Sequence, residues 1–218
     1  MIMHVPATPR GTRSHRAFSL IELMGVMAVM GILVLLSLPT LVSTLRSSYL
    51  NTSGLNLMNQ IALARQTAIA RNLPVEVRFY KVPAVGTAST SAPTAWRAFQ
   101  LFLVESTSVT PLSMVEYTQA AVVVSPAVDK SALFADAGNA GSSHAEKTPG
   151  PTDPNVTPYL KNYHYIAFRI SPSGSVDVQP GRDFVTLVLN DDKTLETGGN
   201  YFTVQIDSVN GNVRSFRP

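Results

Sequence analysis

Hydrophobic positions follow one another without a charge from Leu23 to Leu38, and this run dominates the first part of the chain. With residues 18–22 in front, it makes about twenty residues, the length that an α-helix needs to cross the hydrocarbon core of a bilayer. Glu22 is the one acid in this stretch. An ionised carboxylate at the bilayer centre costs about 2.5–3.5 kcal/mol on insertion scales, so Glu22 needs a partner, and an amine is the candidate. The pattern predicts a transmembrane helix over residues 18–45.

Basic residues lie unequally on the two sides of this helix. Arg10, Arg13 and Arg16 precede it, and Arg46 follows it. Because cytoplasmic flanks carry the excess of Lys and Arg, we expect the N-terminus in the cytoplasm and the bulk of the chain outside. A secretory signal peptide and a plain signal anchor are the alternative interpretations. The apolar run is longer than that of a signal peptide, and neither alternative gives a reason for Glu22.

A helical pattern resumes after Pro39 with an amphipathic character. Small and apolar residues recur at four-three spacing with polar residues between them, which predicts a helix that ends near Arg71. Asn72 and Pro74 supply the stop signal. Pro39 removes a backbone donor and is expected to kink the rod, while the chain continues as one long helix. The apolar stripe, which we expect to pack on a sheet, consists of Leu50, Gly54, Leu57, Ile61, Ala64 and Ala68.

Apolar and alternating runs further along predict antiparallel strands. Residues 73–80 alternate between apolar and polar and predict a half-buried strand. Further strands are expected over 94–104, 115–124, 163–170, 184–189, 201–206 and 213–216, with Asn210-Gly211 as the last hairpin turn. Residues 82–93 and 125–161 lack periodicity and are expected to be variable loops. The predicted fold is α+β, a long N-terminal helix packed on an antiparallel β-sheet, with residues 46–218 as the head.

The residues around the start of the apolar run form a recognisable motif. A basic leader ends in Ala17, and the sequence Phe-Ser-Leu-Ile-Glu-Leu follows it. This motif resembles the class III signal of type IV pilins and type II secretion pseudopilins. The resemblance implies that a prepilin peptidase removes residues 1–17 by cutting between Ala17 and Phe18, and then methylates the Phe18 amine. It also matches Glu22 to the glutamate of the family and Pro39 to a proline in the same helix, although Ala17 stands where glycine is usual.

The newly formed amine gives Glu22 a physical role. An α-amine has a reference pKa of about 7.7–8.0 and is largely cationic at neutral pH. An opposite charge within reach in a medium of low dielectric constant favours the charged forms of both groups. Because residues four apart are neighbours on a helix, Glu22 can meet the amine of its own Phe18 or that of an adjacent subunit. Only the second pairing drives assembly, and the resemblance implies that pairing.

The head carries a narrower resemblance. Residues 60–75, 168–174 and 210–214 are similar to segments of FimT/GspH-type minor pseudopilins. Residues 96–105, 168–177 and 204–218 also resemble the pilin-like group called Verru_Chthon cassette protein D. These resemblances imply a non-enzymatic subunit in the cytoplasmic membrane that enters a type IV pilus or a type II secretion-type pseudopilus. The implied partners are the prepilin peptidase, other pilin or pseudopilin subunits, an inner-membrane assembly platform with its ATPase, and membrane lipid.

Charge and cysteine content narrow the function further. The chain has a formal net charge of +3 and a sequence pI near 9.3, but three of its 17 Lys and Arg residues lie in the predicted leader and none of its 14 acids does. The mature chain is therefore neutral, so the pI gives no argument for a nucleic-acid-binding surface. The chain has no cysteine, so packing and hydrogen bonds alone must hold the exported head.

Catalytic and metal-binding chemistry has little support in the sequence. We find no metal-ligand spacing among the histidines, and no cysteine nucleophile, G-x-S-x-G elbow or phosphate-binding Gly-Lys loop. The histidines are His4, His15, His144 and His164. Asp191, Asp192 and Glu196 offer oxygen ligands for calcium, but turn chemistry explains them equally well. We expect no enzymatic activity, no cofactor and no metal.

A DNA-binding minor pilin that acts in DNA uptake is the alternative function. Some FimT-like proteins use basic C-terminal residues to capture DNA, and Arg214 and Arg217 stand at the matching positions. Asn212 occupies a position where such a binder is expected to have another arginine. Two bases neutralise few phosphates, and a solvated terminal strand is the simpler interpretation of both arginines.

Overall fold

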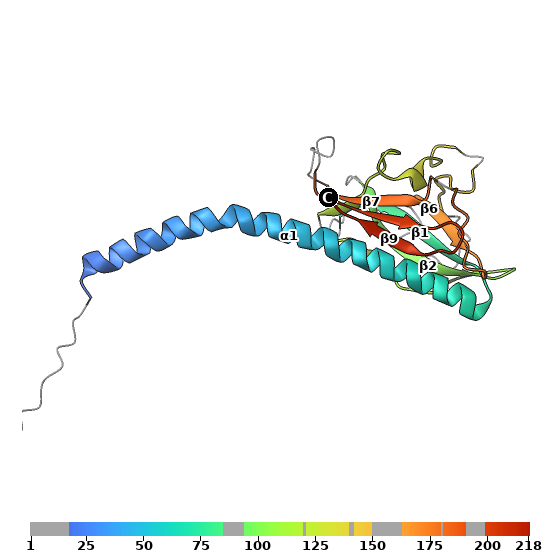
Figure 1. Cartoon of the computed structure of the whole chain (residues 1–218), viewed down its shortest axis with the longest axis horizontal. Helices are drawn as coiled ribbons and strands as arrows, with labels where there is room; N and C mark the ends of the chain where they lie inside the picture. The colour runs from blue at the N-terminus through green and yellow to red at the C-terminus, as the bar shows by residue number, and fades with distance from the viewer. Residues whose placement is uncertain are drawn as a thin grey trace, which may run out of the picture. The chain divides into compact units, whose positions relative to one another are not determined.

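The computed structural model describes residues 18–84, 94–119, 121–139, 142–149, 163–179, 181–190 and 199–218, with the backbone alone for residues 37–40. The chain divides into two compact units, Met1–Ser43 and Thr44–Pro218. Helix α1 runs from Leu20 to Arg71, so the prediction of one long helix is confirmed (Figure 1). Its first half belongs to the first unit, and its second half belongs to the second unit together with every strand.

The second half of α1 packs one stripe of residues against the sheet. Five of the six residues of the predicted stripe are fully buried, namely Leu50, Leu57, Ile61, Ala64 and Ala68. Gly54, the sixth, is buried under the ring of Phe202, and a Cβ atom at Gly54 would lie 2.3 Å from Cδ1 of that ring. The glycine therefore lets the aromatic ring reach the helix backbone, which confirms the predicted stripe and explains its one residue without a side chain.

Helix α1 ends as the sequence predicts. Asn72 adopts a left-handed conformation with φ of 53°. The N–H of Leu73 donates to the carbonyl of Ala68 at 3.3 Å, and the N–H of Asn72 donates to the carbonyl of Ile69 at 3.4 Å. This pair of bonds is the Schellman motif, which satisfies the last carbonyls of a helix. Pro74 then follows and cannot extend the helix.

The strands form a single antiparallel sheet in the order β6-β1-β2-β5-β7-β8-β9, and β3 and β4 pair with β2 outside this path. The strands are β1 Val75–Val82, β2 Ala95–Val104, β3 Val109–Pro111, β4 Glu116–Tyr117, β5 Val122–Val124, β6 Tyr165–Ile170, β7 Phe184–Leu189, β8 Tyr201–Ile206 and β9 Val213–Phe216. Figure 1 shows the second half of α1 running along this sheet. The predicted α+β fold, a helix packed on an antiparallel sheet, is confirmed.

The main core lies between α1 and the sheet and includes part of a segment that the sequence left without structure. Residues Ala132–Phe134 form a short 3-10 helix, η1, and all three are buried. The Phe134 ring lies 5.7 Å from that of Phe79 and 5.1 Å from that of Trp96. A three-residue element is too short to show periodicity, so its contribution to the core could not be read from the pattern.

The outer face of the sheet is also covered, so the prediction of a half-buried first strand is wrong. Seven of the eight residues of β1 are buried. On the outer face Tyr80, Val82, Ala98 and Phe102 form a second apolar cluster. The residues packed on it are Val109, Val115, Tyr117, Tyr163 and Tyr165. These come from β3, β4, β6 and the residues next to them, so distant segments remove the polar side of β1 from solvent.

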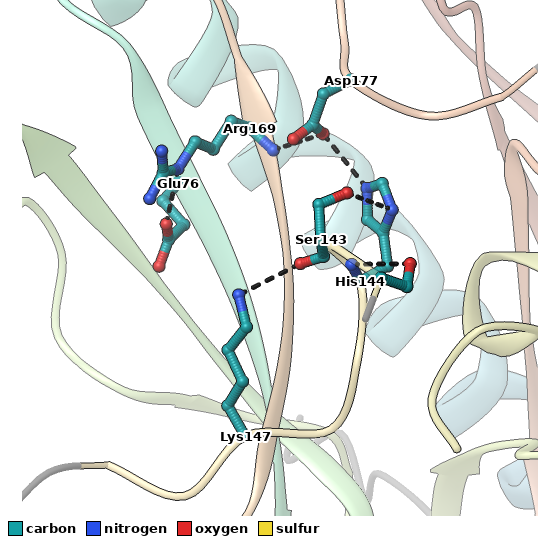
Figure 2. A network of polar contacts seen from close by, with 7 residues as sticks. Glu76, Ser143, His144, Lys147, Arg169 and Asp177 are labelled. Carbon is teal, nitrogen blue, oxygen red and sulfur yellow. Dashed lines mark hydrogen bonds and ion pairs between the residues drawn. The ribbon is translucent and has the colours of Figure 1, made fainter. Parts of the chain in front are cut away.

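A charged cluster lies within this second layer. Glu76 and Arg78 are 5% and 4% exposed, and the Arg78 Nε donates to Glu76 Oε1 at 2.6 Å. The Arg169 Nε donates to the other carboxylate oxygen at 2.8 Å, as Figure 2 shows. The Arg78 guanidinium also lies over the rings of Phe102 and Tyr165, at 4.2 and 4.6 Å. Burial alone would raise the pKa of Glu76, but the two guanidinium groups hold that pKa below its ordinary value.

Two further predictions need correction. The strand expected over residues 115–124 is two short strands, β4 and β5, because Thr118 and the bond from Val122 N–H to the Gln119 carbonyl form a turn between them. The turn between β8 and β9 is longer than Asn-Gly. It spans residues 207–212, where the Gly211 N–H donates to the Asp207 carbonyl at 2.7 Å with φ of 67° at Gly211.

Replacing Gly54 with alanine should destabilise the head. The new Cβ atom overlaps the Phe202 ring, and overpacking of this kind costs about 1–3 kcal/mol, against a gain in helix propensity of about 1 kcal/mol. We expect Gly54→Ala to lower the thermal unfolding midpoint of the full chain in detergent micelles. Phe202→Leu opens space for the Cβ atom, so the added cost of Gly54→Ala should largely disappear in the Phe202→Leu background. Equal costs in the two backgrounds would contradict the close approach.

Because of the Glu76 cluster, the free energy of unfolding should depend on pH in the acidic range. A carboxylate whose folded-state pKa lies below its unfolded value stabilises the fold above the unfolded pKa, and this contribution is lost as the pH falls through the folded pKa. For Glu76 the loss should begin below about pH 4.5, the ordinary value. Denaturant unfolding of the full chain between pH 3 and pH 7 would measure it.

The matched variants are Glu76→Gln, which removes the titrating group, and Glu105→Gln, which alters an exposed carboxylate. Glu76→Gln should flatten the acid limb and lower stability by about 3–5 kcal/mol at neutral pH, because Arg78 is left buried without its counter-charge. Glu105→Gln should keep the wild-type limb. Identical limbs for Glu76→Gln and the wild type would show that Glu76 is not the group responsible.

Candidate processing and assembly site

Helix α1 begins at Leu20, two residues after Phe18, where the predicted mature chain starts. Phe18 and Ser19 precede the helix, and the first helical hydrogen bond runs from the Leu23 N–H to the Ser19 carbonyl at 3.1 Å. Glu22 therefore lies in the first turn. Phe18 is 80% exposed. Ala17, the other residue of the predicted cleavage bond, lies outside the described residues.

The carboxylate of Glu22 has a partner within its own chain. Its Oε2 accepts a hydrogen bond from the Ser19 backbone N–H at 3.1 Å. Ser-x-x-Glu at a helix start is the sequence of a capping box, and a glutamate at this position bonds back to the N-cap amide. The partial positive charge of the helix N-terminus favours an anion in the same place. The Ser-x-x-Glu spacing of a capping box is present in the sequence, so this local partner of Glu22 could have been predicted beside the amine.

This arrangement leaves Glu22 with capacity for a second donor. A carboxylate accepts several hydrogen bonds, and no described residue other than Ser19 has a hydrogen bond to it. The side chain is exposed at the start of the helix. The capped acid is thus satisfied in an isolated chain and still able to receive a cationic donor.

The helix after Glu22 is apolar on all sides rather than along one stripe. It is long and apolar enough by length and composition to cross a membrane, and the window that meets this test is not buried in the structure. The exposed side chains include Leu20, Ile21, Leu23, Met27, Leu35 and Leu36. A helix with this pattern suits a lipid environment or the interior of an assembly. The helix continues through Pro39, whose side chain is not described, so the predicted kink stays a prediction.

The two C-terminal arginines have different neighbours. Arg217 donates to the Ser47 hydroxyl at 2.9 Å and to the Asn51 and Asn200 amide oxygens at 3.4 Å each. Arg214 borders a cavity of about 210 Å³ together with Asp183 and Asp207. Arg217 is therefore hydrogen-bonded to α1 and to the residue before β8. Arg214 lies beside two carboxylates, which repel phosphate. Neither environment favours the alternative of DNA binding.

The histidines of the described part of the chain are joined to carboxylates. His144 Nε2 lies 3.3 Å from Asp177 Oδ1, and its Nδ1 lies 3.1 Å from the Ser143 hydroxyl (Figure 2). His164 Nδ1 lies 3.5 Å from Glu146 Oε1. Within the described ranges no group of three or more metal-ligating side chains occurs. His4, His15, Asp191, Asp192 and Glu196 lie outside those ranges.

Comparison with known proteins bears on the N-terminal segment. The family model of the prokaryotic N-terminal methylation motif matches residues 12–38. The chain carries this motif. The match includes Phe18, Glu22 and the apolar run, so the resemblance of this segment to prepilin signals is confirmed. No curated protein sequence matches the chain.

Three solved structures are similar to the chain that carries this methylation motif. The minor pseudopilin EpsH from the type 2 secretion system of Vibrio cholerae is 9% identical, with 78% of this chain and 97% of that chain covered and a TM-score of 0.41. The type IV minor pilin FimU of Pseudomonas aeruginosa PAO1 is 13% identical, with 78% and 92% covered and a TM-score of 0.40. A second crystal form of FimU is 12% identical, with 78% and 97% covered and a TM-score of 0.39. The narrower assignments, to FimT/GspH-type proteins and Verru_Chthon cassette protein D, stay predictions.

Proposed function

We propose that this protein is a minor pilin or pseudopilin subunit that is made as a precursor, anchored in the cytoplasmic membrane by the first half of α1, and built into a type IV pilus or a type II secretion-type pseudopilus. Residues 1–17 are its leader, residues 18–45 its anchor and residues 46–218 its head. The N-terminus faces the cytoplasm, and the head lies on the other side of the membrane.

One observation carries this proposal. Glu22 lies in the first turn of a helix that is apolar on all sides, inside the matched methylation motif. The bond to the Ser19 amide gives the acid a local role, but a plain anchor gains nothing further from the charge, which raises the cost of insertion. In a subunit whose N-terminal amine is freed at Phe18, four residues before Glu22, the acid can pair with an amine of this kind.

The proposed mechanism adds a second, cationic partner to Glu22. In the isolated chain the Ser19 amide caps the carboxylate. After cleavage between Ala17 and Phe18, the methylated Phe18 amine of a neighbouring subunit approaches the same carboxylate. The ammonium carries a full positive charge, whereas the Ser19 amide is neutral, so in a medium of low dielectric constant the ion pair adds a direct charge–charge attraction that fixes the longitudinal register of the incoming helix. Pro39 allows the helix to adapt within the filament by removing one backbone hydrogen bond.

Each step of the proposed mechanism requires a partner. A prepilin peptidase supplies cleavage and methylation, so the chain itself needs no catalytic residue, cofactor or metal. Other pilin or pseudopilin subunits supply the helices that surround α1. An inner-membrane platform and its ATPase supply the work of extraction from lipid.

Replacing Ala17 with tryptophan should block maturation, because a large side chain next to the scissile bond hinders access of the peptidase. We expect the intact mass of the protein from native membranes to remain that of the precursor. Ala17→Gly is the matched control, because it installs the residue usual in the family and should yield a chain starting at methylated Phe18. A mature mass for Ala17→Trp equal to that of the wild type would refute the assigned cleavage site.

Replacing Glu22 should leave processing intact and prevent incorporation into filaments. Glu22→Ala removes both the charge and the cap, whereas Glu22→Gln keeps an oxygen that can accept the Ser19 N–H. We expect both variants to be cleaved and both to lose at least about tenfold in filament-associated subunit, a factor equivalent to about 1.4 kcal/mol. Immunoblots of membrane and sheared filament fractions would measure this. If Glu22→Gln enters filaments normally, the charge is not the register element and the cap is the function of this side chain.

A further inference from the structure

The two edges of the sheet differ in how they are protected. The strand order places β6 at one edge and β9 at the other. Strand β9 has four residues, and one of them is Arg214. Strand β6 has six residues with two aromatic side chains, two isoleucines, one charge and no proline or glycine. A segment of that composition on an open edge is a template for pairing with another chain.

The outward backbone groups of β6 can be identified from its pairing with β1. The Lys81 N–H donates to the His164 carbonyl at 2.9 Å, so the polar backbone groups at position 164 point toward β1. Because these groups alternate in direction along an antiparallel strand, those of Tyr165, Ala167 and Arg169 point away from the sheet.

Both ends of this outward row are bonded within the chain. Tyr165 and Lys147 exchange two backbone hydrogen bonds of 2.8 Å each. The Arg169 N–H donates to Asp177 Oδ1 at 2.7 Å, and the Asp177 N–H donates to the Arg169 carbonyl at 3.0 Å. Ala167, between them, is 6% exposed. An incoming strand therefore finds both ends of the outward row occupied and the middle residue nearly inaccessible.

Side chains hold the segment that provides this cover, residues 142–149, which we name the edge strap. His144, which is 8% exposed, contacts the same Asp177 oxygen that caps Arg169. The Lys147 ammonium donates to the Ser143 carbonyl at 3.1 Å, and the Glu146 N–H donates to the Ala137 carbonyl at 2.8 Å. Figure 2 shows the strap residues gathered beside β6, with Asp177 placed between His144 and Arg169.

We propose that the edge strap and Asp177 seal the β6 edge against strand pairing with a second copy of this chain. His144 is a positioning residue in this device, since it orients the carboxylate that occupies the Arg169 N–H. The β9 edge needs no such cover, because it has only four residues and a very short edge strand discourages strand addition. The seal excludes the β6 edge from contacts between copies, and it does so whether or not the chain enters a filament.

The test compares two double variants of the full chain in detergent micelles. Lys147→Pro with Asp177→Ala removes the donor to the Tyr165 carbonyl and the acceptor of the Arg169 N–H. Lys147→Ala with Asp177→Asn is the matched control, because it alters the same side chains but keeps the backbone pairing and an oxygen for Arg169. Hydrogen exchange of the peptide covering residues 163–170 reports the edge, and that covering residues 75–82 reports the core.

We expect the first variant to exchange about fivefold faster at β6, the factor for the net worth of one hydrogen bond, with β1 still protected. It should also form large assemblies by light scattering that show the infrared band of intermolecular β-structure. The control should stay as small as the wild type. Unchanged exchange at β6, or faster exchange without assembly, overturns the proposal.

A single variant covers the case in which the double variant loses its core. Asp177→Ala leaves the Lys147 pairing in place and opens only the Arg169 end. It should expose the Arg169 amide and produce a smaller fraction of assemblies. Asp177→Ala that exposes this amide and remains monodisperse overturns the proposal equally.

Discussion

Helix α1 is continuous, but its two halves have different surroundings, and the packing of the rest of the molecule depends on this constraint. The first half of α1 is apolar on every side, whereas the second half keeps a single stripe for the sheet. At Gly54 the stripe has no side chain, and the Phe202 ring of the sheet occupies the space. With no cysteine in the chain, this contact and the sheet hydrogen bonds must hold the head without covalent help.

The parts that could be predicted from the sequence are those with strong local periodicity or specific backbone chemistry. The stripe of α1 and its stop at Asn72 follow from four-three spacing and turn preference, and strands β7, β8 and β9 match their predicted ranges. The outer face of β1 could not be predicted, because Glu76 and Arg78 are polar by pattern and become buried only when distant segments cover them. Contacts between segments that are far apart in the sequence leave no pattern in either segment alone.

The candidate site shows the same division. Glu22 stands out in the sequence because hydrocarbon penalises charge, and its position at the helix start is what the structure adds. Its bond with the Ser19 amide gives the acid a local partner, so an unassembled chain avoids a bare carboxylate. The edge strap lies in a segment rich in small and polar residues, where neither the 3-10 helix nor the Lys147 pairing has a recognisable pattern.

The contact between the last arginine and α1 connects the two ends of the head in sequence. Arg217 donates to Ser47 and Asn51, which lie on either side of Leu50, the first fully buried residue of the stripe, and also to Asn200, the residue before β8. The C-terminal residues are therefore tied to α1 by side-chain hydrogen bonds, in addition to the backbone pairing of β9 with β8. The guanidinium thus links the end of the chain to the part of α1 where the buried stripe begins.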